Sequence, residues 1–367
     1  MVISSLYIHI PFCAHICAYC DFSKVLYDEK WAFSYIEELK REILSYPLAR
    51  NQFETIYIGG GTPTCLKKEL LEDLLSFLRP YLKIDGEFTI EGNPENIDDE
   101  LLAILKEGGI NRISLGMESS HKKYLALMGR KHSYKDVKNA VGLIKKWGFE
   151  NISVDLIYAL PGENLNELKE DVASMLALNI PHLSAYSLTI NPGTSFYNNG
   201  FKEMDDSLEA DMYELILSSF RNAGYKRYEV SNFAKPAFYS RHNLTYWHDE
   251  EYYGCGLGAS GYVDGFRYTN TRSLGVYLKG KYRAEEEKLS VNSQLEDFFL
   301  TNLRLEDGFM KKAFEKRFGF PFFTKFSIPF LKLHNEGLIN ENSDSIFVSD
   351  KGMLLLDRVL LEFFEKI

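Results

Sequence analysis

The sequence predicts an α/β protein, in which a parallel sheet curled into a partly open barrel of six strand–helix units precedes a smaller, mainly helical domain. Two observations carry this prediction. Short apolar runs alternate six times with longer stretches of helical periodicity between residues 6 and 194, and such alternation is typical of parallel sheets with helices outside. The unusual loops, rich in Cys, Gly, Asn and Pro, all follow strand ends, where α/β barrels place their chemistry.

Each expected strand is a short apolar run that a polar or glycine-rich loop ends. The six strands are expected at residues 6–10, 55–58, 87–91, 111–115, 151–158 and 182–188. Helices are expected where apolar residues recur at helical spacing. These helices are expected at residues 28–46, 67–81, 98–106, 122–128, 134–147 and 165–178. Six units instead of eight leave the barrel partly open, which suits a large substrate.

The alternation fades after residue 205. A helix is expected at residues 208–223 and a strand at 224–233. A dense aromatic stretch at 241–248 and four closely spaced glycines between 254 and 261 follow without a clear period.

The end of the chain is mostly helical. Residues 345–352 are expected to form a small hairpin before a final helix, an order typical of a winged helix. We therefore expect a barrel at residues 1–235, an extension of it at 236–290, and a winged-helix-like C-terminal domain at 291–367.

Composition restricts the function. The chain has 367 residues, 45% hydrophobic and 26% charged, which is ordinary for a globular protein. A net charge of −10 argues against a general nucleic-acid binder, because phosphate contacts need a surplus of Lys and Arg. No signal peptide and no transmembrane-length apolar run is expected, and five cysteines fit a reducing cytoplasm. The 23 Tyr and 26 Phe would also suit a flat apolar ligand.

Three cysteines, Cys13, Cys17 and Cys20, lie within eight positions on the loop after the first strand. Three thiolates on one short loop can hold three irons of a [4Fe–4S] cluster and leave the fourth iron open to a small molecule. A disulfide would leave one cysteine unpaired. A zinc site would need a fourth ligand, and the loop constrains His15. The cluster is therefore the leading interpretation.

The pattern Cys13-x-x-x-Cys17-x-Tyr19-Cys20 resembles the signature of radical S-adenosylmethionine (SAM) proteins. The resemblance implies that the methionine amine and carboxylate of SAM chelate the open iron. It also implies that the reduced cluster cleaves SAM to a 5′-deoxyadenosyl radical. Tyr19 matches the aromatic residue that this family places before the third cysteine.

The resemblance assigns further residues to SAM, and each also has a plain structural reading as a turn, a core residue or a solvated charge. Glycines let a ligand approach the backbone, and the triple glycine after the second strand is similar to the stretch that holds the methionine amine. A carboxylate inside an apolar strand, such as Asp155, needs a partner. The residues expected to contact SAM are Tyr7, Tyr19, Gly60, Gly61, Thr62, Glu91, Glu118, Arg130 and Asp155.

Two of these residues need comment. Arg130 is expected to bind the SAM carboxylate, which a guanidinium fork suits. Glu118 stands where relatives usually carry glutamine. Either side chain can accept a hydrogen bond from a ribose hydroxyl, but the extra charge alters that contact.

Longer stretches narrow the resemblance to the oxygen-independent coproporphyrinogen III oxidase group. They include Tyr-Ile-His-Ile-Pro-Phe-Cys at 7–13, Tyr-Glu-Val-Ser-Asn-Phe-Ala at 228–234 and Arg-His-Asn-x-x-Tyr-Trp at 241–247. The group contains true oxidases, which decarboxylate two propionates, and haem chaperones, which bind and hand over haem. Phe22 stands where oxidases have a further cysteine, and the segment before Cys13 is short. Both features favour the haem chaperones.

The chaperone reading makes His242 the candidate haem ligand, since imidazole is a common axial ligand of haem iron. A satisfied structural histidine is an equal alternative. The resemblance further implies haem delivery to respiratory haem proteins, with a possible membrane contact and a possible homodimer. We expect no nucleic-acid partner. The alternative function is the SAM-dependent oxidative decarboxylation of coproporphyrinogen III.

Overall fold

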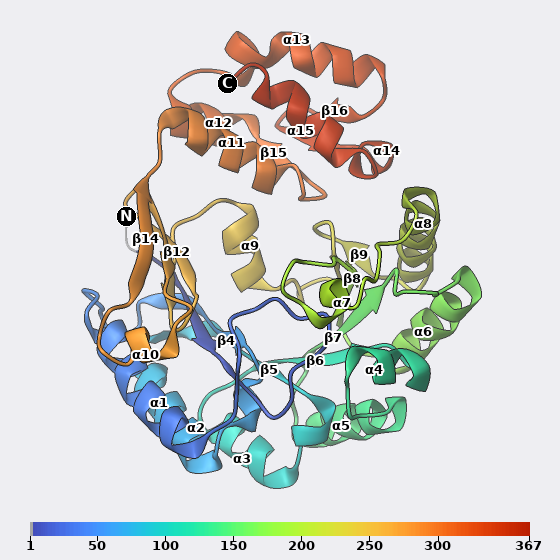
Figure 1. Ribbon diagram of the computed structural model, residues 1–367. Helices are drawn as coiled ribbons and strands as arrows, with labels where there is room; N and C mark the ends of the chain where they lie inside the picture. The colour runs from blue at the N-terminus through green and yellow to red at the C-terminus, as the bar shows by residue number, and fades with distance from the viewer. Residues whose placement is uncertain (1–2) are drawn as a thin grey trace.

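The computed structural model describes residues 3–367 and is organised around a curved nine-stranded sheet with helices on its outer surface (Figure 1). The sheet order is β11-β1-β4-β5-β6-β7-β8-β10-β9. The parallel strands are β1 (Ser5–Ile10), β4 (Phe53–Gly60), β5 (Leu82–Gly92), β6 (Arg112–Glu118), β7 (Asn151–Tyr158), β8 (His182–Ser187) and β11 (Tyr253–Cys255). This arrangement confirms the predicted partial barrel of six strand–helix units.

The helices between these strands also form where helical periodicity predicted them. They are α1 (Glu29–Leu44), α2 (Lys68–Leu78), α3 (Asp99–Glu107), α4 (Lys122–Met128), α5 (Tyr134–Lys146) and α6 (Leu165–Ala177). After β8, the predicted helix α8 (Asp206–Asn222) also forms, and it is preceded by a short helix that was not predicted, α7 (Ser195–Asn198). Asp28 and Asp98 cap α1 and α3 by accepting hydrogen bonds from backbone N–H groups of the first turn. Such caps satisfy donors that the helix itself leaves free.

A row of isoleucines crosses the sheet. Ile8, Ile58, Ile90, Ile113 and Ile152 are consecutive register partners on β1, β4, β5, β6 and β7, and all are buried. Side chains alternate between the two faces of a strand. The isoleucine row therefore packs against the helix layer, and the intervening residues face the interior of the barrel.

The strand predicted at residues 224–233 is wrong. Two short strands form instead, β9 (Lys226–Arg227) and β10 (Asn232–Ala234), and both pairings of β10 are antiparallel. The Glu229 carboxylate accepts hydrogen bonds from the Ser231 backbone N–H and the Asn232 side chain. These bonds fold the chain back between the two strands.

The segment from 236 to 290 holds structure that the sequence did not reveal. The stretch around His242 is helix α9 (Arg241–Trp247), and β11 joins the barrel sheet beside β1. A separate antiparallel sheet of β12 (Ser260–Val263), β13 (Phe266–Asn270) and β14 (Arg283–Lys288), with α10 (Leu274–Tyr277), leads to the C-terminal part.

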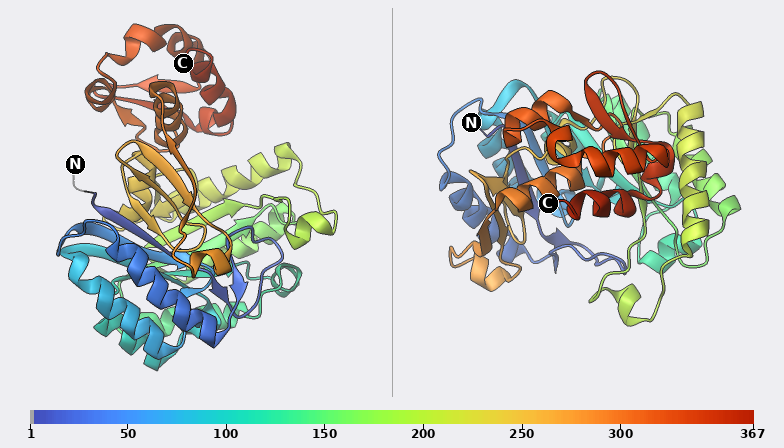
Figure 2. Two further views of the ribbon diagram at one scale, coloured as in Figure 1. Left: turned by 60° about the vertical axis from the view of Figure 1, so that its left-hand side comes forward. Right: turned by 90° about the horizontal axis from the view of Figure 1, so that it is seen from above.

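The C-terminal part lies above the barrel in Figure 1 and in the left view of Figure 2. Its helices are α11 (Val291–Asn302), α12 (Lys311–Phe318), α13 (Phe322–Asn335), α14 (Asp350–Met353) and α15 (Leu356–Phe364). Its strands β15 (Phe309–Met310), β16 (Ile339–Glu341) and β17 (Ser345–Val348) form a small sheet. The mainly helical character is as predicted. The hairpin predicted at residues 345–352 is displaced, since β16 pairs with β17 and the residues from Asp350 on form helix α14. Within residues 3–367, no helix has the length and apolarity needed to cross a bilayer.

Candidate functional site

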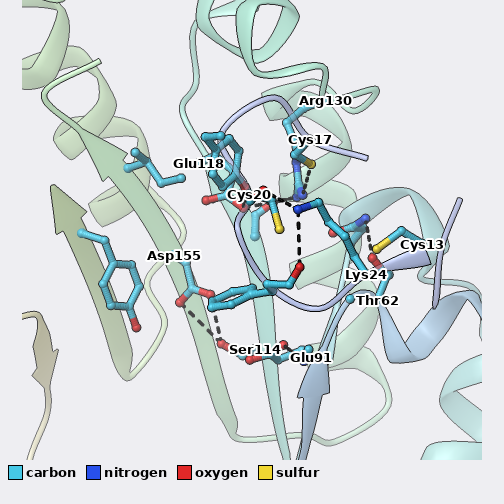
Figure 3. A pocket seen from close by; sticks show the side chains of 18 of the residues that line it. Cys13, Cys17, Cys20, Lys24, Thr62, Glu91, Ser114, Glu118, Arg130 and Asp155 are labelled. Carbon is cyan, nitrogen blue, oxygen red and sulfur yellow. Dashed lines mark hydrogen bonds and ion pairs between the residues drawn. The ribbon is translucent and has the colours of Figure 1, made fainter. Parts of the chain in front are cut away.

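A cavity of about 400 Å³ opens where the carboxyl ends of the parallel strands meet the cysteine loop. Figure 3 shows the side chains that project into it from the loop after β1 and from the barrel strands. All but two of the predicted site residues line this cavity. Those that line it are Cys13, Cys17, Tyr19, Cys20, Gly60, Gly61, Thr62, Glu91, Glu118, Arg130 and Asp155.

The cysteine loop is held at both ends. Cys13 belongs to a two-residue strand, β2 (Phe12–Cys13), which pairs with β3 (Val25–Leu26) and closes the loop. All five cysteines are free thiols. Burial is the main cause that raises the pKa of Cys13 to about 11, and burial also raises the pKa of Cys20. In the absence of a metal these two thiols therefore stay protonated at neutral pH.

The loop and the triple glycine fit a cluster held against the barrel. A Cβ atom on Gly61 would lie 2.8 Å from the Cys13 sulfur and 2.7 Å from the Phe12 carbonyl oxygen. Gly60 has a φ of +114°, and a Cβ there would collide with the His9 ring. Only glycine lets the β4 end approach the cysteine loop so closely.

The thiols are not arranged around one point. Among residues 3–367, no three His, Cys, Asp or Glu side chains converge on a site for a single metal ion. A [4Fe–4S] cluster makes a different demand, since each thiolate binds a separate iron. Three free thiols that border one cavity, without a disulfide in the described chain, are compatible with that demand.

Arg130 connects the cysteine loop to strand β6 (Figure 3). Its guanidinium lies 3.7 Å from the Cys17 sulfur, donates to the Gly116 carbonyl at 2.7 Å, and lies 3.5 Å from the Glu118 carboxylate. Tyr19 donates to the same carboxylate at 3.1 Å. Glu118 has a φ of +61° at an irregularity of the β6–β7 pairing, which turns its side chain toward Arg130.

Two more carboxylates face the cavity from the strands. Glu91 accepts hydrogen bonds from the Tyr57 hydroxyl at 2.7 Å and from the Gly60 backbone N–H at 3.0 Å. Burial raises the pKa of Glu91. Asp155 receives long hydrogen bonds of 3.4 and 3.5 Å from Ser114. Burial, together with the nearby charge of Glu118, raises the pKa of Asp155 to about 7.

The sequence reasoning missed several lining residues. Arg112, Ser114 and Ser184 line the cavity. Arg112 and Ser114 alternate with apolar residues in β6, and this alternation is a signal that could have identified them. Lys24 donates to the carbonyl oxygens of Cys20 and Phe22. No pattern indicated Asn243, which reaches the cavity from α9.

Family models match two parts of the chain. The radical SAM superfamily model matches residues 7–175, and the HemN C-terminal domain model matches residues 289–355. The curated protein "Heme chaperone HemW" of Lactococcus lactis is 41% identical over 98% of this chain and 97% of the relative. The protein of the same name from Bacillus subtilis is 37% identical and covers 98% of each chain.

The chain belongs to the HemW family of radical SAM proteins. Among solved structures, coproporphyrinogen III oxidase (HemN) from Escherichia coli superimposes with a TM-score of 0.85. The alignment covers 100% of this chain and 91% of that chain, at 22% identity. At this identity the likeness shows a shared fold, a radical SAM barrel with a parallel-strand core and a helical C-terminal region.

Two predicted residues of this HemW-family chain lie outside the lining of the cavity, among the residues that the structure describes. Tyr7 accepts or donates a 3.0 Å hydrogen bond with His9 and stacks on Tyr57. His242 is 1% exposed. Its Nδ1 lies 2.7 Å from the Thr55 hydroxyl and its Nε2 lies 2.7 Å from the Tyr246 hydroxyl.

The surroundings of His242 are those of a structural histidine. Burial lowers its pKa to about 3, so the ring is neutral and uses one nitrogen as donor and one as acceptor. Coordination of haem iron by either ring nitrogen would break one of these two hydrogen bonds and would need access to a side chain that is 1% exposed. The predicted ligand role of His242 thus stays a prediction, and this arrangement does not favour it.

Proposed function

We propose that this chain is a haem chaperone that holds a [4Fe–4S] cluster on Cys13, Cys17 and Cys20 and binds SAM in the adjoining cavity. The observation that carries the proposal is the meeting of three free thiols, a triple glycine and an arginine at one cavity, in a chain that matches curated haem chaperones over nearly its full length.

Different residues of the cavity would bind the cluster and the methionine end of SAM. The thiols would hold the cluster, and Gly60, Gly61 and Thr62 would let the methionine end of SAM approach the β4 backbone. Arg130 offers a guanidinium for a carboxylate. When bound, a [4Fe–4S] cluster and SAM supply one-electron chemistry.

The remaining polar side chains would orient the nucleoside part of SAM. Glu91, Glu118 and Asp155 are acceptors suited to ribose hydroxyls or the amine, and Tyr19 fixes Glu118 through its hydroxyl. Tyr7 would act through Tyr57 and His9, since it contacts both.

The proposal also names the ligand that the chaperone carries and the proteins that receive it. Haem is the cargo, as the printed names of the relatives state for those proteins. We infer that haem passes to respiratory haem proteins, from a cytoplasmic protein that touches the membrane surface and can form a homodimer. The domain limits at residues 235 and 290 are also part of this proposal.

An anaerobic haem titration of the cluster-loaded protein, followed by absorbance, tests the function. We expect saturation near one haem per chain. The variant Cys17→Ala should lose iron and sulfide after reconstitution, and Cys65→Ala, which changes a cysteine outside the motif, should retain both. An absence of saturable haem binding, together with SAM-dependent loss of two carboxylates from coproporphyrinogen III, would overturn the chaperone in favour of the oxidase.

A further inference from the structure

The mouth of the cavity carries two exposed aromatic side chains. Phe22 is 63% exposed and Tyr186 is 41% exposed, and both line the cavity. Phe22 follows the third cysteine on the loop, whereas Tyr186 lies near the end of β8 on the far side of the barrel. An exposed aromatic residue beside a polar cavity leaves a large apolar surface in water, which calls for an explanation.

The backbone around Phe22 is fixed although its side chain is exposed. Arg272 donates to the Asp21 carbonyl at 2.5 Å and to the Ser23 hydroxyl at 2.9 Å. The Ser23 carbonyl lies 2.7 Å from His9 Nε2, and Lys24 donates to the Phe22 carbonyl at 3.4 Å. An aromatic ring on an ordered backbone loses little freedom when it binds a ligand, so Phe22 is preorganised as an anchor.

The two sides of the mouth are joined. The Asn191 side chain, from the segment after β8, donates to the Asp21 carboxylate at 2.8 Å. This bond links the segment next to Phe22 to the segment that follows Tyr186. Tyr186 lines the cavity and is also 41% exposed, so part of its side chain is open to solvent at the mouth.

We propose that Phe22 and Tyr186 form a stacking site for the tetrapyrrole macrocycle at the mouth of the cavity. This inference rests on the proposed haem-chaperone function and names where the cargo binds. Aromatic faces favour a flat, apolar π-system. Lys24 lines the cavity beside Phe22 and offers a cation to a propionate of the ring. Phe22 and Tyr186 are exposed at the mouth, whereas His242 is buried.

The test is an anaerobic titration of the cluster-loaded protein with haemin and, separately, with metal-free protoporphyrin IX. Removal of the ring in Phe22→Ala should weaken both ligands about tenfold or more, because the burial of one aromatic side chain corresponds to at least that factor. Tyr186→Leu should have the same direction of effect, and Phe22→Trp should restore binding. Phe33→Ala, which removes an exposed aromatic residue on the outer helix α1, is the control and should change neither affinity.

The outcomes separate the site from the function. Saturable haem binding by the wild type with unchanged affinity in Phe22→Ala and Tyr186→Leu would overturn the stacking site and leave the chaperone intact. A wild type that binds haem but not protoporphyrin IX would also overturn the stacking site, since stacking does not need the iron. A wild type that fails to saturate would refute the chaperone itself. Iron and sulfide are measured in each variant. If Phe22→Ala loses the cluster, the affinity of Tyr186→Leu for the two ligands decides whether the stacking site exists.

Discussion

Burial, together with the nearby charge of Glu118, raises the pKa of Asp155 in the cavity to about 7, near the physiological range. Below this pH the carboxyl is neutral, and above it the carboxylate attracts the positively charged SAM. We expect SAM affinity to rise about three- to tenfold between pH 6.0 and 7.5, as one charge appears in a buried site. Equilibrium dialysis under nitrogen measures this change. Asp155→Asn should flatten the profile, and an equally steep profile in that variant would exclude Asp155 as its source.

His242 should contribute to stability without any haem. His242→Ala removes the hydrogen-bond partner of the buried Tyr246 hydroxyl, leaves Thr55 with Ser5 as its remaining partner, and opens a cavity, which costs about 2–4 kcal/mol in the free energy of unfolding. Tyr246→Phe removes one bond and should cost about 1 kcal/mol. Urea unfolding of haem-free protein measures both. If His242→Ala unfolds like the wild type, the imidazole has no structural role and ligation gains support.

The functional role of a cavity residue could be predicted from the sequence where the residue belongs to a short local motif. The cysteines, the triple glycine, Glu91 and Arg130 have short local patterns, and the structure brings them to one cavity. Asn243 reaches the same cavity only because the path of the folded chain brings α9 to it. Such a placement is a property of the folded chain and leaves no local pattern.

At the scale of elements, strand and helix positions within the barrel followed from periodicity, because six similar units repeat one pattern. The failures lie where tertiary contacts decide. Strand β11 has three residues, and a Cβ on Gly254 would lie 1.8 Å from the Ser260 carbonyl oxygen. A strand of three residues is too short to show a hydrophobic period. Its central residue must also be glycine, because β12 lies so close. Residues 224–233 contain a turn that the Glu229 carboxylate stabilises.

The approach of β4 to the cysteine loop gives a prediction at this scale. Gly61→Ala should displace Cys13, because the new methyl group would lie 2.8 Å from its sulfur. We expect the reconstituted variant to hold less than about half the iron of the wild type, since one of three cluster ligands moves. Gly142→Ala, in helix α5 with no atom within 4 Å of the new Cβ, is the control and should keep full iron content. Equal iron in both variants would contradict the proposed position of the cluster.

At the scale of the whole molecule, ion pairs join the barrel to the C-terminal part. Arg221 and Arg227 both pair with Glu306 and Asp350, but the Arg227 side chain is 1% exposed and that of Arg221 is 38% exposed. Because the two arginines share their partners and differ in burial, a comparison of their variants measures the effect of burial on these ion pairs.

We expect Arg227→Ala to lower the free energy of unfolding by about 3 kcal/mol, because it also leaves the Tyr213 hydroxyl without this donor. Arg221→Ala should cost less than about 1 kcal/mol, as solvent screens its pairs. Thermal unfolding at low and high salt measures both, and only the smaller effect should fade with salt. Equal losses of unfolding free energy in the two variants would mean that burial does not determine the strength of the ion pairs between the barrel and the C-terminal part.

The pairing of β11 with β1 has a consequence for the order of folding. Leu6 and Tyr253 are register partners, and Arg272 fixes the segment after the last cysteine. A chain that leaves the ribosome from its N-terminus therefore exposes its cysteines long before the residues that complete their surroundings exist. Assembly of the proposed metal centre would in this sense be post-translational: the nascent chain presents thiols, and only the finished polypeptide presents a pocket.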